Sequence, residues 1–220
     1  MALLLLVRHA VTEATGRRLS GNMPGLHLSD RGRQQAERLA ERLASMPLAA
    51  LYSSPLERCM ETAAALSGGR SLDVVALPSI REVEYGRWTG RPLAQLARTT
   101  LWRQLLHSPS SVRFPEGETL PEVQRRSVGA LDEVAARHPK GRVAVVTHAD
   151  VIRLVLAHYA GIHIDLFQRL IVSPASVTAV GLGDRVPRIL RTNDTGGFED
   201  LMERSGPQGQ RPGRSGVRRS

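Results

Sequence analysis

The stretch LLLLVRHAVTEA (residues 3–14) decides the fold. Residues 3–7 form a continuous apolar run, which is typical of a strand buried on both faces of a sheet. The run stops at Arg8 and His9, two residues for which a buried strand has no structural use. Because open α/β sheets bind ligands at the carboxyl edge of their strands, we interpret this cation and this imidazole as parts of a site at that edge.

Five further runs predict strands, and helical patterns separate most of them. The runs lie at residues 49–53, 72–77, 143–147, 177–182 and 188–192. Ser29 is expected to cap a helix within 29–46, and Ser54 and Pro55 are expected to start another. Further helices are predicted at about 92–106, 119–137 and 149–160. This alternation predicts an α/β fold with a mostly parallel sheet.

Composition indicates one domain and a basic tail. The chain has 220 residues, 41% of them hydrophobic, and a formal net charge of +9. We expect a domain over residues 1–200 and a disordered tail over 203–220, which is rich in Gly, Pro, Ser and Arg. Lys140 is the single lysine among 30 basic residues, so the charge reflects an arginine bias across the chain, and no nucleic-acid partner is expected.

Features that would direct the chain to a membrane or an oxidising compartment are weak. The apolar run at residues 2–6 is far shorter than the roughly 20 residues of a membrane helix, and no basic segment precedes it. Cys59 is the only cysteine, which excludes an internal disulfide and suits a reducing compartment. We therefore expect no signal peptide, no membrane span and a cytoplasmic location.

A second histidine repeats the opening pattern. In VAVVTHADVIRLVL (143–156), an apolar run ends, His148 follows at once and a helix begins. If the two strands are adjacent and parallel, His9 and His148 face each other at one edge. Arg58, near the start of its predicted helix, should reach the same edge. With Arg8 this set predicts an anion site, since guanidinium groups match phosphate oxygens and repel a divalent metal ion.

Phosphoryl transfer is the chemistry that needs such a set. A neutral imidazole can attack phosphorus and form a phosphohistidine, and the departing alkoxide then needs a proton. The stretch IREVEYGRWTG (80–90) supplies Glu82 and Glu84 as candidate acids. A carboxyl group in such a site should have a raised pKa. Spacing alone does not choose between the two glutamates.

Four motifs in order resemble the histidine phosphatase superfamily, also called phosphoglycerate mutase-like. They are VRHAVTEAT, YSSPLERCMETA, REVEYGRWTG and VVTHADVIR, and LSDRGRQQAERLAERL lies between the first two. The resemblance implies a three-layer α/β/α core and no cofactor. It further implies His9 as the phosphorylated nucleophile, Glu82 as acid and base, and Arg8, Arg58 and His148 as phosphate ligands.

The chain departs from the pattern of the family it resembles at three places. Ala10 replaces a glycine after the nucleophile, which costs little if the backbone there keeps a negative φ. Thr15 replaces an asparagine that usually helps hold phosphate. Ala149 and Asp150 replace a glycine pair, and Asp150 is either a helix-start charge or a specificity element.

The resemblance also indicates residues that contact the substrate. Ser20 and Gly21, in LSGNMPG, resemble pocket residues of relatives, and Thr15 is carried over as a substrate-binding position. Glu118 is also similar to a feature of the family, although a carboxylate ahead of a helix start explains it equally well.

The length of one segment favours hydrolysis. Mutases that resemble this chain carry a longer insertion between the acid and the second histidine, which keeps water off the phosphoenzyme. Here residues 88–119 are short, so we predict a metal-independent phosphomonoesterase acting on a small phosphorylated metabolite. The alternatives are phosphoglycerate mutase-type transfer and a catalytically weak phosphate-binding protein. Residues 177–182 are a possible edge strand that would pair subunits in a homodimer.

Overall fold

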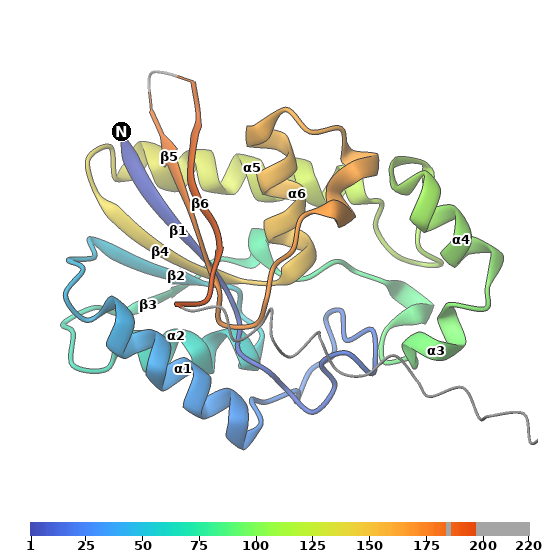
Figure 1. Cartoon of the computed structure of the whole chain (residues 1–220), viewed down its shortest axis with the longest axis horizontal. Helices are drawn as coiled ribbons and strands as arrows, with labels where there is room; N and C mark the ends of the chain where they lie inside the picture. The colour runs from blue at the N-terminus through green and yellow to red at the C-terminus, as the bar shows by residue number, and fades with distance from the viewer. Residues whose placement is uncertain (184–185, 197–220) are drawn as a thin grey trace, which may run out of the picture.

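One six-stranded sheet with helices on both faces forms the core of the computed structural model, which describes residues 1–183 and 186–196 (Figure 1). The strand order is β3-β2-β4-β1-β5-β6. Strands β3, β2, β4 and β1 run parallel to one another, and β5 is antiparallel to both β1 and β6. The predicted three-layer α/β/α fold and its mostly parallel sheet are confirmed. The strands are β1 (Ala2–Arg8), β2 (Ala50–Ser53), β3 (Val74–Ala76), β4 (Arg142–Thr147), β5 (Val177–Leu182) and β6 (Arg188–Asp194).

The apolar run of β1 supplies both cores of the molecule. Leu5 and Val7 pack into the cluster under helices α1 and α2, whereas Leu4 and Leu6 pack into the cluster under α5 and α6. Figure 1 shows these two helix pairs on opposite faces of the sheet, with α3 and α4 beyond its edge. The helices are α1 (Asp30–Leu43), α2 (Glu57–Ser67), α3 (Leu93–Leu96), α4 (Thr100–His107), α5 (Leu120–Arg137) and α6 (Ala149–Ala160). Short 3₁₀ turns lie at Pro78–Ile80, Gly86–Trp88, Pro109–Ser111 and Ile164–Arg169.

The start of α2 differs from the prediction. The helix begins at Glu57 and not at Pro55, and its N-cap residue, Leu56, makes no side-chain capping bond. Ser54 is used elsewhere: its N–H donates to Val146 O, and its hydroxyl lies 2.8 Å from His148 Nε2. The serine therefore serves the site in place of capping the helix.

The single helix predicted over 92–106 is two helices, α3 and α4. Thr99 interrupts the pattern because its extended backbone and its hydroxyl, which accepts the Trp102 N–H, start a new N-terminus. The break lets α3 and α4 take different directions beside the sheet (Figure 1).

The prediction that residues 177–182 form an edge strand is wrong. They form β5, which lies between β1 and β6, and all six residues are buried. The edge is β6, where exposed residues predominate. A run without charged residues, such as VTAVGL, is typical of an interior strand, because both of its faces are covered.

Part of the predicted domain organisation lies outside the described residues. The basic tail at 203–220 and the boundary at residue 200 both fall there. Within the part of the chain that the structure describes, no helix is long and apolar enough to cross a membrane.

The predicted cap of α1 is confirmed and gives a stability test. Ser29 Oγ accepts the Gly32 N–H at 3.1 Å, which satisfies one of the unpaired donors at the helix start. We expect Ser29→Ala to lower the free energy of unfolding by about 1 kcal/mol, measured by urea denaturation. Ser45→Ala is the matched control, because Ser45 is exposed just after the same helix. Equal losses in the two variants would contradict a capping role for Ser29.

Candidate active site

The two histidines lie side by side at the carboxyl edge of the sheet. Arg8 pairs with Thr147 in the register of β1 and β4, so His9 and His148 are the next residues of neighbouring parallel strands. The His9 N–H donates to Thr147 O at 2.9 Å, and the two ring centroids are 5.3 Å apart. The strands are adjacent and parallel, which is the condition under which the sequence places the two histidines face to face.

Hydrogen bonds assign different tautomers to the two rings. His9 Nδ1 lies 2.7 Å from Ala10 O, an acceptor, so Nδ1 carries the proton and Nε2 keeps its lone pair. His148 Nδ1 lies 3.3 Å from Arg58 Nη2, which can only donate, so the proton of His148 is on Nε2 and is directed to Ser54 Oγ. His9 therefore has an available nucleophilic nitrogen.

Both imidazoles are neutral at physiological pH. Burial lowers the pKa of His9 well below its ordinary value, and the charges of Arg58 and Arg8 lower it further. The pKa of His148 is lowered by burial, then by Arg58 and by His9. A neutral imidazole is the form that can attack phosphorus.

Two arginines, the buried Arg58 and the partly buried Arg8, present buried hydrogen-bond donors that no described group accepts. Arg58, the second residue of α2, is 1% exposed, and its Nη2 donates to Gly21 O at 2.7 Å. Its Nε and Nη1 lack partners among the described residues, as does Arg8 Nε. Arg8 Nη1 donates to Val172 O. Buried cations without partners are costly, and a tetrahedral anion would supply the missing acceptors.

Glu82, and not Glu84, lies beside the histidines. Glu82 Oε2 is 4.0 Å from His148 Nδ1, whereas the Glu84 carboxylate accepts from Asn22 Nδ2. Burial raises the pKa of Glu82 to about 7, and the charge of Asp150 adds to this, against the opposing effect of Arg58. A carboxyl group that is half protonated near neutral pH is suited to act as a general acid and then as a base.

An ion pair between Arg126 and Glu118, which the sequence analysis did not predict, holds the backbone of the loop that carries Glu82. Arg126, on α5, donates to Ser79 O, Arg81 O and Glu82 O at 2.7, 2.9 and 3.0 Å. Both carboxylate oxygens of Glu118 accept from the same guanidinium. The two residues therefore fix the position of the acid loop. Of these two residues, only Glu118 is singled out by the sequence, through its similarity to a feature of the family.

Of the three predicted substrate-binding residues, Gly21 contacts the cluster. Its carbonyl accepts from Arg58, and its φ of +51° is one that glycine adopts readily. The Thr15 hydroxyl accepts the Thr12 N–H within its own turn, and the Ser20 carbonyl accepts the Met23 N–H. The roles of Thr15 and Ser20 in substrate binding stay predictions.

The departure at Ala10 leaves the backbone unstrained. Ala10 is not among the described residues with positive φ, and its N–H donates to Thr62 Oγ1. Alanine is therefore tolerated at this position, since the backbone keeps the negative φ that the sequence analysis required.

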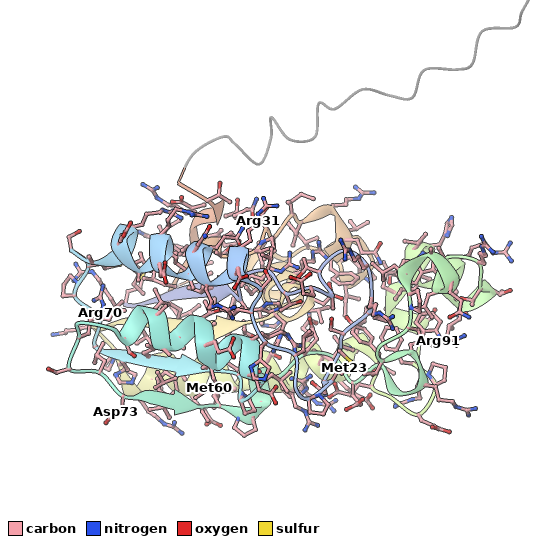
Figure 2. All side chains as sticks on the ribbon, turned by 90° about the horizontal axis from the view of Figure 1, so that it is seen from below. Met23, Arg31, Met60, Arg70, Asp73 and Arg91 are labelled. Carbon is pink, nitrogen blue, oxygen red and sulfur yellow. The ribbon has the colours of Figure 1, made fainter. Side chains whose placement is uncertain are left out.

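The loop of Gly21 joins the core to the α3–α4 segment. The Leu19 N–H donates to Arg91 O, and the Leu19 carbonyl accepts the Gly90 N–H. Figure 2 shows Met23 between Met60, on α2, and Arg91. The loop therefore forms one wall beside the cluster.

Metal-binding side chains are not gathered at this edge. Within the described residues, no group of three or more His, Cys, Asp or Glu is arranged to hold a metal ion. The arrangement combines two guanidinium groups, two neutral imidazoles and one carboxyl of raised pKa, which suits a phosphoryl anion.

Comparisons with known proteins agree with this geometry. Residues 4–195 match the histidine phosphatase superfamily (branch 1). The chain is 32% identical to Phosphoserine phosphatase 1 of Hydrogenobacter thermophilus, over 89% of this chain and 93% of that protein. It is 28% identical to Probable phosphoglycerate mutase GpmB of Cronobacter sakazakii, over 82% of this chain and 85% of that protein. The structure of YhfR of Bacillus stearothermophilus superposes with a TM-score of 0.83 at 27% identity, over 88% of this chain and 98% of that one.

Proposed function

Because the chain belongs to the histidine phosphatase superfamily, we propose that it hydrolyses phosphate monoesters through a phosphohistidine at His9 and without a metal ion. The observation that carries the proposal is the set of buried, unpartnered guanidinium donors of Arg8 and Arg58 beside a neutral His9. Their charges neutralise the equatorial phosphoryl oxygens, a role that a metal ion has elsewhere.

In the first step, the Nε2 lone pair of His9 attacks phosphorus while the bond from phosphorus to the ester oxygen breaks. Glu82 gives its proton to the departing oxygen, so the alcohol leaves neutral. The bound dianion favours a proton on His148, whose Nδ1 then donates to a phosphoryl oxygen.

In the second step, water replaces the alcohol. Glu82, now a carboxylate, takes a proton from the water, whose oxygen attacks phosphorus. The bond between phosphorus and His9 breaks, and inorganic phosphate leaves. The acid is thereby restored for the next turnover.

Access of water favours hydrolysis over mutase-type transfer. The side chain of Glu82 is 12% exposed, so this part of the site is open to solvent. Residues 88–119 fold as α3, α4 and a short turn beside the sheet. The resemblance implies a longer insertion here in mutases, which keeps water off the phosphoenzyme. The similarity to a probable phosphoglycerate mutase makes isomerisation the enzymatic rival.

A small phosphorylated metabolite of the cytoplasm is the substrate class that we propose. The phosphoserine phosphatase among the relatives makes O-phosphoserine the first compound to assay. Phosphoglycerates follow, because of the mutase relative.

Turnover of p-nitrophenyl phosphate in the presence of EDTA tests the proposal. We expect p-nitrophenolate release that EDTA does not reduce, because arginine charges take the place of a metal ion. Loss of activity in EDTA that added metal restores would contradict metal independence. No turnover of any ester in a broad panel would favour a phosphate-binding protein. Isomerisation of 3-phosphoglycerate faster than phosphate release would favour a mutase.

A further inference from the structure

An ion pair at the start of α6 has no role in the mechanism above. Asp150 Oδ1 accepts from Arg153 Nη1 at 2.8 Å, and the two side chains are 22% and 25% exposed. A partly exposed pair of opposite charges beside a ligand site is available to solutes.

This pair lies close to the acid, Glu82. Asp150 is two residues after His148, and its Oδ2 accepts from Tyr85 Oη at 2.6 Å. Tyr85 follows Glu82 by three residues. His148, two residues before Asp150, lies 4.0 Å from the acid (Nδ1 to Glu82 Oε2), so the pair is near Glu82. In agreement, the charge of Asp150 contributes to the raised pKa of Glu82. Because the acid must reach the ester oxygen, its neighbours line the leaving-group side.

Both members of the pair keep free hydrogen-bonding capacity. Each carboxylate oxygen of Asp150 accepts one bond in the structure and can accept another. Arg153 Nε donates to Leu170 O, which fixes the guanidinium, and among the described residues its Nη2 has no partner. The pair can therefore bind one cationic and one anionic group at the same time.

We propose, resting on the proposed phosphatase function, that Asp150 and Arg153 form a leaving-group subsite that selects phosphate esters of zwitterionic amino-acid alcohols. Asp150 accepts from the substrate ammonium group, and Arg153 Nη2 donates to its carboxylate. A substrate with the carboxylate and no ammonium group keeps the bond from Arg153 and brings Asp150 no cationic partner, which disfavours its binding relative to the zwitterion.

Two substrates that differ in one group test the role of Asp150. O-Phosphoserine carries an ammonium group on the carbon where 3-phosphoglycerate carries a hydroxyl. We expect kcat/KM to favour phosphoserine by about tenfold or more, the usual effect of a hydrogen bond to a charged group. In Asp150→Asn this ratio should fall toward one. Any change in the Glu82 pKa acts on both substrates and cancels in the ratio at one pH.

Arg153 has its own matched pair of substrates. Phosphoethanolamine keeps the ammonium group of phosphoserine and lacks the carboxylate. We expect Arg153→Gln to lower kcat/KM for phosphoserine by about tenfold more than for phosphoethanolamine. An equal loss for both compounds would overturn the assignment of Arg153.

Tyr85→Phe separates recognition from a structural role. This variant removes the hydrogen bond to Asp150 and leaves the carboxylate in place. We expect it to keep the wild-type preference for phosphoserine over 3-phosphoglycerate. If it loses the preference as fully as Asp150→Asn does, Asp150 is only a partner of Tyr85 and the proposal is overturned.

Hydrolysis of p-nitrophenyl phosphate distinguishes failure of the proposed subsite from failure of the proposed phosphatase function. An enzyme that cleaves this ester and does not prefer phosphoserine overturns the subsite and leaves the phosphatase function standing. An enzyme that cleaves none of these esters overturns both.

Discussion

Replacing His9 with alanine is expected to lower kcat for p-nitrophenyl phosphate by on the order of 10⁴-fold or more, because no other group can accept the phosphoryl group. His148 cannot substitute. Its Nδ1 accepts from Arg58, and its Nε2 is directed to Ser54, so neither nitrogen offers a free lone pair. Initial rates of p-nitrophenolate release, at matched protein concentration, measure the loss.

A control and a trapping experiment support the assignment to His9. His158→Ala should keep wild-type rates, since His158 is an exposed residue in the last turn of α6. Quenching the wild-type enzyme during turnover should give an alkali-stable, acid-labile phosphoryl group on the peptide that contains His9. Undiminished turnover in His9→Ala, or a label on the peptide that contains His148, would remove His9 as the nucleophile.

The features predicted from sequence are those that strand-end geometry determines. His9 and His148 each follow a buried apolar run directly, and parallel neighbours bring such positions together without further information. Arg58 was expected at the same edge because the side chain of a first-turn residue points toward the helix N-terminus. Its contacts with Gly21 and His148 agree with that expectation.

Features that depend on contacts between distant segments were not predictable. Arg126 reaches the backbone of Glu82 across 44 residues, and its side chain carries no local pattern that distinguishes it from other helical arginines. The bond from Tyr85 to Asp150 spans 65 residues. By contrast, the interior position of β5 had a signal in the sequence, since VTAVGL carries no charged residue, whereas RILRTND of β6 carries three.

Replacing Glu82 with glutamine is expected to lower kcat by about 10²- to 10⁴-fold for an alkyl phosphate such as glycerol phosphate. Glutamine keeps the size of the side chain and cannot give a proton to the departing alkoxide. p-Nitrophenolate is a stable anion that needs little protonation, so the loss with p-nitrophenyl phosphate should be smaller. The ratio of the two losses therefore reports general-acid catalysis at the leaving group.

The pH profile adds a second signature of Glu82. Its pKa is raised to about 7, so the carboxyl is protonated below that pH and loses its proton above it. Because a general acid acts in its protonated form, kcat/KM of the wild type should fall as the pH rises above about 7, and Glu82→Gln should lack this fall. Glu84→Gln is the matched control, since that carboxylate binds Asn22. If Glu84→Gln loses as much activity and the same alkaline limb, the acid is Glu84, and the 4.0 Å approach of Glu82 to His148 has no catalytic meaning.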